Sequence, residues 1–299
     1  MVSTHAPRFR VLFAVAAAVA LLAGCDIKVD DGKFSVGVSR GRATDEWTRA
    51  YTLPGDGRVE IINENGSIEA RRATGPQVTV KAFREVSDSS DDKAQARLQS
   101  LKMREDVGAD HVSIEAETGE SSPFGMRRGI SVRYEVELPP GLSVTLKTQN
   151  GTVRLDRVDG RITAASTNGI VRGQSVSGSV QGSTVNGSVQ MDIVALTGDV
   201  RLSTVNGTVR LELPKDIDAD LEATTVNGGV SVDSELGLSQ SASRSGFGPK
   251  THISGRLNKG GPRVSLMTTN GGVRVSLRGG GDGDRGQRGR GDRGRDEAN

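Results

Sequence analysis

The stretch Thr204-Val-Asn-Gly-Thr-Val-Arg-Leu211 is one copy of a unit that returns along the chain. After its glycine, apolar and polar residues alternate, so that Val209 and Leu211 point to one side of the backbone and the polar residues to the other. Alternation of this kind is typical of a β-strand with one face buried. The sequence therefore predicts a half-buried strand immediately after an Asn-Gly turn.

The Asn-Gly pair recurs, and a valine follows two residues later each time. Successive asparagines are separated by 18, 18, 20, 21 and 43 residues, and the last gap is close to two repeats. An earlier copy has isoleucine in place of the valine. A period near 20 residues indicates stacked units rather than one folded-back core. The asparagines are Asn65, Asn150, Asn168, Asn186, Asn206, Asn227 and Asn270.

A second alternating segment follows about ten residues after the first, as at Val200 and Leu202. If each strand pairs with its own copy one coil away, the result is a parallel β-solenoid of two-stranded coils of about 18–21 residues. In sequence order, Val209 would then lie between Val189 and Val230. The alternative is a row of antiparallel hairpins, because Asn-Gly is also a strong hairpin signal. The near-equal spacing favours the solenoid.

Two local features refine this prediction. Inward Gly173 and Gly182 fall in one coil, which predicts a thinner core there. Glycine and asparagine suit turns because both reach positive φ at low cost. The asparagine amides could hydrogen-bond from coil to coil as a ladder, or each could satisfy only its own turn as an Asx motif.

The N-terminus reads as an export signal. Arg8 and Arg10 precede an apolar run that is too short to span a bilayer as a helix. The run ends in Leu22-Ala23-Gly24-Cys25, which resembles the lipobox of bacterial lipoproteins. The resemblance implies a signal peptide over residues 1–24, a lipid on Cys25 and attachment to a membrane. Residues 25–50 are polar and irregular, and we expect them to form a tether.

The main domain is expected to span residues 51–277. Strands are predicted at 58–62, 67–70, 77–82, 111–116 and 130–138, with one short helix capped by Ser89 or Ser90. Residues 234–259 are rich in serine and glycine, and we expect them to loop out of the stack. This insert would explain the doubled gap before Asn270.

The order of these segments resembles a known family. An early strand with Asn65-Gly-Ser-Ile68, a short helix and Tyr134-Glu-Val-Glu-Leu-Pro139 precede the serial Asn-Gly-x-Val coils, and Thr268-Thr-Asn-Gly-Gly-Val273 closes them. This layout is similar to the putative adhesin family of bacterial envelope proteins, a domain of unknown function built as a β-solenoid. The resemblance covers roughly residues 50–277 and brings no catalytic residues with it.

Residues 278–299 consist almost entirely of glycine, arginine and acidic residues, so we expect a disordered tail. The whole chain carries a formal charge of +2, and loss of Arg8 and Arg10 with the signal leaves 0. A neutral mature domain lacks the positive charge of a nucleic-acid binder. We therefore expect no nucleic-acid partner.

Residues that could carry chemistry are few. Only His111 and His252 remain after the signal, and they lie far apart in sequence, so no metal site or other cofactor is expected. Outward carboxylates could cleave sugars, but alternating outward charges are more often a solvated sheet face. These carboxylates are Asp156, Asp159, Asp199 and Glu212.

The sequence therefore predicts a non-enzymatic lipoprotein of the cell envelope, anchored to a membrane by its lipid. Its polar solenoid face would bind an envelope polymer or another envelope protein, or act as a scaffold. The alternative is a polysaccharide-active β-helix enzyme that uses the outward carboxylates.

Overall fold

The computed structural model describes residues 25–30, 33–38, 41–117, 129–241 and 251–279. Within these residues, β1 (Cys25–Asp30) and β2 (Lys33–Val38) form an antiparallel pair, and the other strands form one curled sheet. The predicted signal peptide, and all of the predicted tail except Arg278 and Gly279, lie outside the described residues.

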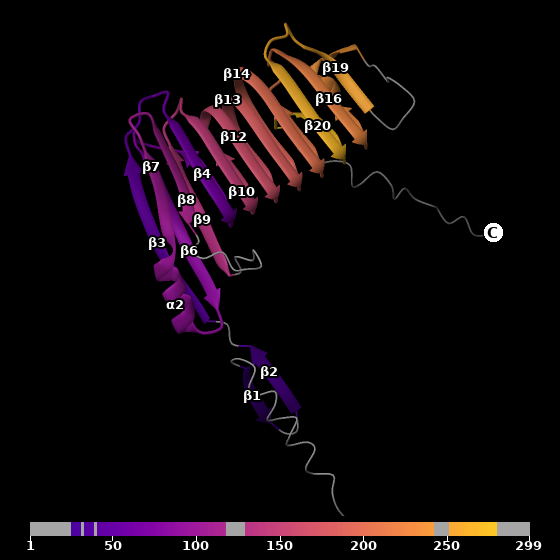
Figure 1. Ribbon diagram of the computed structural model, residues 1–299. Coiled ribbons are helices and arrows are strands. Elements are labelled where there is room, and N and C mark those ends of the chain that lie inside the picture. Colours follow the sequence, from indigo (N-terminus) through magenta and orange to yellow (C-terminus); the bar gives the residue numbers. More distant parts are fainter. Residues whose placement is uncertain (1–24, 31–32, 39–40, 118–128, 242–250, 280–299) are drawn as a thin grey trace, which may run out of the picture.

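The sheet is a stack of coils, each made of two short strands that meet at a turn (Figure 1). Along the stack, the first strands are β8 (His111–Glu117), β4 (Arg58–Asn65), β10 (Ser143–Asn150), β12 (Asp159–Asn168), the second half of β13 (Val171–Asn186), the second half of β14 (Val189–Asn206), β20 (Arg263–Asn270) and β16 (Ala219–Asn227). The second strands are β9 (Ile130–Leu138), β5 (Ile68–Arg72), β11 (Val153–Asp156), the first halves of β13 and β14, β15 (Val209–Leu213), β21 (Val273–Leu277) and β17 (Val230–Val232).

Neighbouring coils pair in parallel and in register. Asn168 of one coil lies beside Asn150 and Asn186 of the coils on either side, and the second strands pair in the same way. This confirms the parallel solenoid, and the hairpin alternative was wrong because each turn joins two strands that pair with other coils.

The core lies between the two strands of each coil. Val209 and Leu211 are fully buried, as the alternation predicted. Gly173 and Gly182 do face inward, and the side chain of Met191 from the next coil fills the space beside them, because a Cβ on either glycine would contact it. The flexible methionine therefore compensates for the two missing side chains.

The coils do not stack in sequence order. The last pair of strands, β20 and β21, lies between β14–β15 and β16–β17. Val209 therefore has Val189 and Val273 as neighbours, and the prediction that Val230 adjoins it was wrong. All Asn-Gly coils carry similar side chains, so their sequence does not decide which two become neighbours.

The insert between the last two repeats closes the end of the stack. Its described part holds the short 3-10 helix η1 (Ser234–Leu236), β18 (Ser239–Ser241) and β19 (Thr251–Leu257). β19 pairs antiparallel with β16, and β18 pairs with β19. The prediction of a loop outside the stack was wrong for these residues, because the exposed edge of β16 gains a hydrogen-bonded partner from the insert.

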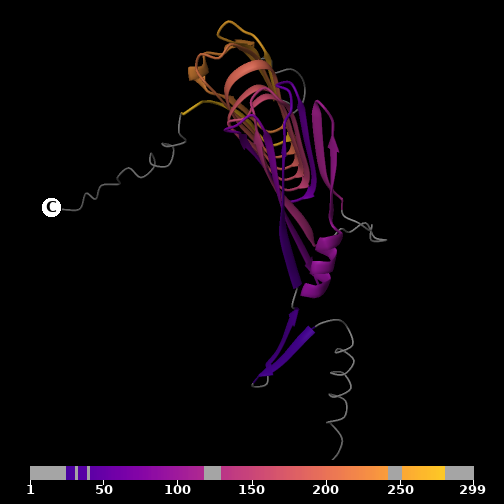
Figure 2. The ribbon, with the colours of Figure 1, turned by 90° about the vertical axis from the view of Figure 1, so that its left-hand side faces the viewer.

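At the other end, three additional strands and a helix surround the first coils (Figures 1 and 2). β3 (Gly41–Tyr51) and β6 (Val78–Asp88) pair antiparallel, and β7 (Lys102–Val107) pairs with β8. The predicted tether over residues 25–50 was therefore wrong for residues 41–50, which are in β3, and β1 and β2 are strands as well. Hydrogen bonds to β6 hold β3 in place along its whole length.

The helix α2 (Asp91–Ser100) starts where the sequence indicated. The Ser90 hydroxyl accepts a hydrogen bond from the Lys93 amide, which is the usual role of an N-cap serine. Ala94 and Leu98 are buried against the sheet. Trp47 of β3 is half-buried and packs on the same core.

Candidate functional site

The seven asparagines of the Asn-Gly turns lie in one row at the exposed rim of the stack. Asn65 at one end of the row only accepts, and the side-chain amide of each of the other six donates to the carbonyl oxygen of its neighbour on the Asn65 side at 2.8–2.9 Å. Along the stack, the order is Asn65, Asn150, Asn168, Asn186, Asn206, Asn270 and Asn227. The amides are thus occupied with one another, and this rim joins coils.

The glycine that follows each asparagine has a specific steric role. At Gly207 (φ +154°) a Cβ would collide with the carbonyl oxygen of Gly187 in the neighbouring coil, and Gly187 stands in the same relation to Gly169. Gly151 is equally crowded although its φ is not in the left-handed region. Close approach of the backbones therefore requires glycine here, in addition to the positive φ that the sequence suggested.

A second row, which the sequence analysis missed, lies just inside the rim. A buried threonine or serine stands two residues before each asparagine from Asn150 onward, and its hydroxyl donates to the glycine carbonyl of the neighbouring coil at 2.8–3.1 Å. The row is Thr148, Ser166, Thr184, Thr204, Thr268 and Thr225. The signal was present as Ser/Thr-x-Asn-Gly in every one of these repeats.

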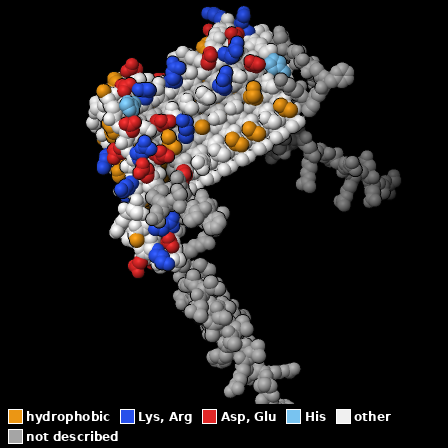
Figure 3. All heavy atoms as spheres, in the orientation of Figure 1, with side chains coloured by type: hydrophobic (Ala, Val, Ile, Leu, Met, Phe, Trp, Pro, Cys, Tyr) orange, Lys and Arg blue, Asp and Glu red, His pale blue; other side chains and the backbone are white. Residues whose placement is uncertain are grey.

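The outward face of the first strands is flat and divided lengthwise (Figure 3). Charged side chains follow one side of this face, and small and apolar ones follow the side next to the asparagine rim. Val185, Val205 and Val226 are each about 40% exposed there, and Met267 is 54% exposed. These four side chains give the rim side of the face an apolar character.

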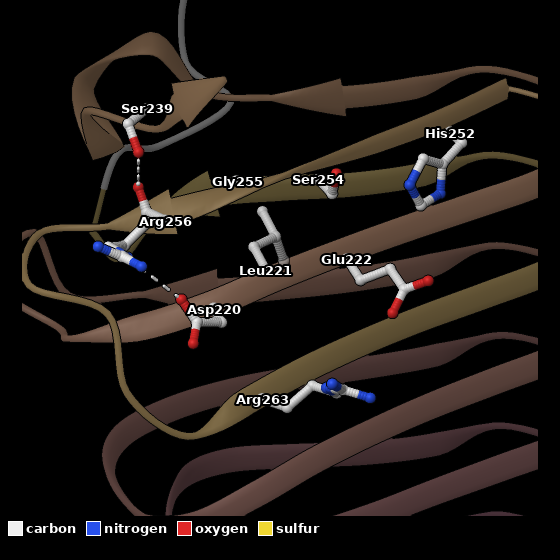
Figure 4. A pocket seen from close by; sticks show the side chains of 9 residues that line it. All are labelled: Asp220, Leu221, Glu222, Ser239, His252, Ser254, Gly255, Arg256 and Arg263. Carbon is white, nitrogen blue, oxygen red and sulfur yellow. Dashed lines mark hydrogen bonds and ion pairs between the residues drawn. The ribbon is translucent and has the colours of Figure 1, made fainter. Parts of the chain in front are cut away.

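A hollow of about 580 Å³ lies at the end of the stack that the insert closes (Figure 4). Asp220 and Glu222 of β16 project into it from one strand, with Arg256 of β19 and Arg263 of β20 beside them. Asp220 pairs with Arg256 at 3.6 Å. The nearby His252 ring shares a hydrogen bond of 2.9 Å with the Thr224 hydroxyl.

The carboxylates that the sequence suggested for sugar cleavage are not brought together. Asp156 bonds to its neighbour Arg157 at 2.9 Å and lies on the second-strand face with Glu212, three coils away. Asp199 accepts a hydrogen bond from the Arg263 amide at 2.9 Å. Asp159 begins β12, two coils from Asp199. These positions do not form one catalytic pair.

Ionisable groups with shifted pKa values lie at the other end of the stack. The pKa of Asp88 is lowered by the Ser89 amide and by Arg97, and that of Asp110 is lowered by His111 and Arg58. These contacts hold the turn before α2 and the turn before β8. They stabilise local structure and do not converge on a cleft.

Two further observations concern the part of the chain that the structure describes. No group of three or more His, Cys, Asp or Glu side chains there could hold a metal ion. None of its helices combines the length and the apolar character needed to cross a membrane.

Comparison with known proteins places the fold. A family model described as Toastrack DUF4097 matches residues 52–276. No curated protein matches the chain.

Solved structures with a similar chain course are distant in sequence. A putative cell adhesion protein from Clostridium sporogenes is 12% identical with a TM-score of 0.47, over 79% of this chain and 100% of that one. A putative adhesin from Bacteroides fragilis is 10% identical with a TM-score of 0.30, over 78% and 97% of the two chains. A putative lipid binding protein from Parabacteroides distasonis is 7% identical with a TM-score of 0.23, over 77% and 96%.

Proposed function

The chain belongs to the Toastrack DUF4097 family, and on that premise we propose that it is a non-enzymatic binding module of the cell envelope. The observation that carries the proposal is the repetition of its outward faces. Successive coils present side chains at matched register, as Ser183, Ser203 and Met267 do on the first-strand face. Strands in a sheet lie about 4.8 Å apart, so each column is a regular array. Such an array is suited to a partner that is itself extended or repetitive.

The test is retention on envelope material. The purified full chain, extracted in detergent, is incubated with isolated peptidoglycan and with isolated envelope polysaccharide, and bound protein is measured after sedimentation. We expect saturable binding to one of these polymers with no release of reducing sugar. Release of sugar that follows the amount of protein would contradict a non-enzymatic role, and absence of binding to every envelope fraction would contradict the module itself.

We further propose that Cys25 carries a lipid which attaches the protein to a membrane. The support is the Leu-Ala-Gly-Cys sequence that ends the apolar N-terminal run. Two or three acyl chains give stable anchoring where one is marginal. Cells that express the Cys25→Ser chain should accumulate an unprocessed precursor that takes up no labelled palmitate. Normal palmitate labelling of this variant would refute the proposal.

A second candidate function is sugar hydrolysis in the hollow at the closed end of the stack. Asp220 and Glu222 alternate along β16, so both face the hollow with their Cα atoms about 7 Å apart. A pair of carboxylates is the arrangement that most glycosidases use. If the wild-type chain releases reducing sugar and Glu222→Gln does not, this function replaces the first. Equal release by the two proteins would exclude the hollow as its source.

A further inference from the structure

A column of long cationic and amide side chains follows the outward face of the second strands. Arg154, Arg172, Gln190, Arg210 and Arg274 occupy the same position in five consecutive coils. At the usual strand spacing of about 4.8 Å, the column is about 19 Å long. None of its five positions holds an acidic residue. We call these five residues the arginine column.

Positive charge accumulates toward the Arg274 end of this column. At the other end, Glu69 of the adjoining coil pairs with Arg154 at 3.4 Å. Arg210 and Arg274 are cross-strand neighbours, and like charges directly opposite each other in a sheet are destabilising. Arg172 uses two of its N–H groups on the Gln190 side-chain oxygen, at 2.7 and 3.1 Å, which leaves other donors of its guanidinium available.

The neighbouring acidic residues only partly offset this charge. Asp192 is held by Arg278 at 2.7 Å and by the Ser175 amide at 3.0 Å. Among the residues that the structure describes, that leaves Glu212 as the remaining carboxylate that lines the same hollow as Arg172 and Arg210. The described side chains that line this hollow therefore carry a net positive charge, although the mature chain is formally neutral.

Arg172, Arg210 and Arg274 border a depression in the sheet. It has a volume of about 500 Å³, and its lining includes Gly173 and Met191. The register of β13 and β14 shifts between Gly173 and Val176, and Ser175 adopts φ +51°, so the bulge interrupts the flat face at this point. An anion placed in the depression would be shielded from part of the solvent, which strengthens its interaction with the guanidinium groups.

We propose that the arginine column binds a linear anionic polymer that lies along the stack, with its phosphate or carboxylate groups between successive arginines. Guanidinium groups bind both anions through paired hydrogen bonds, which explains arginine in preference to lysine at these positions. The bound anions would also relieve the repulsion between Arg210 and Arg274. This inference rests on the proposed binding function and specifies its ligand class and its face.

The test uses the full chain in detergent with three soluble probes: polyphosphate, polygalacturonate and uncharged dextran. Affinity is measured by titration at low and at moderate salt. The column variant combines Arg172→Gln, Arg210→Gln and Arg274→Gln. The matched control removes three exposed cations from the opposite face, outside the hollow at the closed end. It combines Lys147→Gln, Arg161→Gln and Arg201→Gln.

We expect the wild-type chain to bind at least one polyanion, with affinity that falls as salt rises, and not to bind dextran. The column variant should bind at least tenfold more weakly, and the control variant should stay within about twofold of wild type. A preference for polyphosphate or for polygalacturonate identifies which anion the column takes. Circular dichroism should show no loss of thermal stability in either variant, because the substituted side chains are exposed and the column variant also removes the repulsion between Arg210 and Arg274.

Equal weakening of both variants would overturn the proposal, because diffuse charge and not the column would then bind the polymer. Absence of binding to either polyanion would overturn it as well. If the column variant still sediments with envelope polymer as wild type does, this inference fails while the proposed function stands. If wild type is retained by no envelope fraction and no polyanion, both fail.

Discussion

The row of buried hydroxyls beneath the asparagine rim offers a sharp test of what holds one coil to the next. Thr204 is 4% exposed and donates to the Gly187 carbonyl oxygen at 2.9 Å. The carbonyls on either side of Gly187 accept amides of the preceding coil, so the Thr204 hydroxyl fills the gap between those bonds. Thr204→Val keeps the shape of the side chain and removes the donor.

The expected loss of stability follows from the Gly187 carbonyl, which the substitution leaves without its hydrogen-bond donor. A lost hydrogen bond of this kind costs about 1 kcal/mol, and a buried carbonyl left unpaired raises the cost toward 3 kcal/mol. Because valine fills the same volume, no cavity cost is added. We expect Thr204→Val to lower the free energy of unfolding by about 1–2 kcal/mol. In a domain of this size, that corresponds to about 2–8 °C in the thermal midpoint.

Urea and thermal denaturation followed by circular dichroism would measure the loss. Thr167→Val is the matched control, because Thr167 is exposed and lies two residues before Gly169. This substitution should change stability by less than about 0.5 kcal/mol. Thr204→Ser retains a hydroxyl and should fall between wild type and Thr204→Val. If Thr204→Val and Thr167→Val proved equally stable, the hydroxyl row would have no role in joining coils.

Three further outcomes are expected. Val209→Asp places a charge in the dry core and should cost far more stability than Thr208→Asp. Hydrogen exchange should show that amide protection is lost first in the adjoining coils. Equal costs for the two variants would refute the alternation of buried and exposed residues along this strand. Truncation after Gly279 should leave the thermal midpoint within about 2 °C of the wild-type value. Truncation after Leu277 also removes the contacts of Arg278 to Asp192, Ser175 and Leu213, and calorimetry should show a measurably lower midpoint for that chain. The folded pKa of Asp88 lies below its unfolded value of about 3.9. The contribution of Asp88 to stability is therefore present above that pH and is lost as pH falls through the folded pKa. Asp88→Asn should flatten the dependence of stability on pH below about pH 4, and an unchanged slope in acid denaturation would exclude the Ser89 and Arg97 contacts as the source of that dependence.

Much of the fold could be predicted from local pattern. The alternation after each Asn-Gly pair fixed which side chains are buried, and the regular period indicated parallel stacking. The position of the last coil could not be predicted, because Val230 and Val273 carry equivalent signals and either could adjoin Val209. β3 was missed for a different reason. Its sequence is mostly polar and shows no sustained alternation, because only Gly41 and Ala43 are buried in it. Pairing with β6 is what makes it a strand.

The candidate sites were harder to predict than the strands. The arginine column depends on the neighbours of Arg210, and these are known only once the coil order is known. The hollow at the closed end forms between β16, β20 and the insert strand β19, and β16 and β20 are separated by the insert in the sequence. A site whose residues come from several coils leaves no compact sequence motif. The sequence therefore shows which carboxylates point outward but not which of them lie close together.

The location of β20 and β21 has a consequence for how the chain can be completed. Among the described strands, β16 and β17 pair with β20, β21 and the insert strand β19, and no pairing joins them to β14 or β15. A chain that is synthesised from its N-terminus therefore makes β16 and β17, at the far end of the stack, before it makes β20 and β21, which lie between them and the earlier coils. A product cut short before residue 263 would lack β20 and β21, and any sheet edge it left unpaired could pair with another molecule. The last coil to be synthesised is therefore an inner coil of the stack, with coils made earlier on both sides of it.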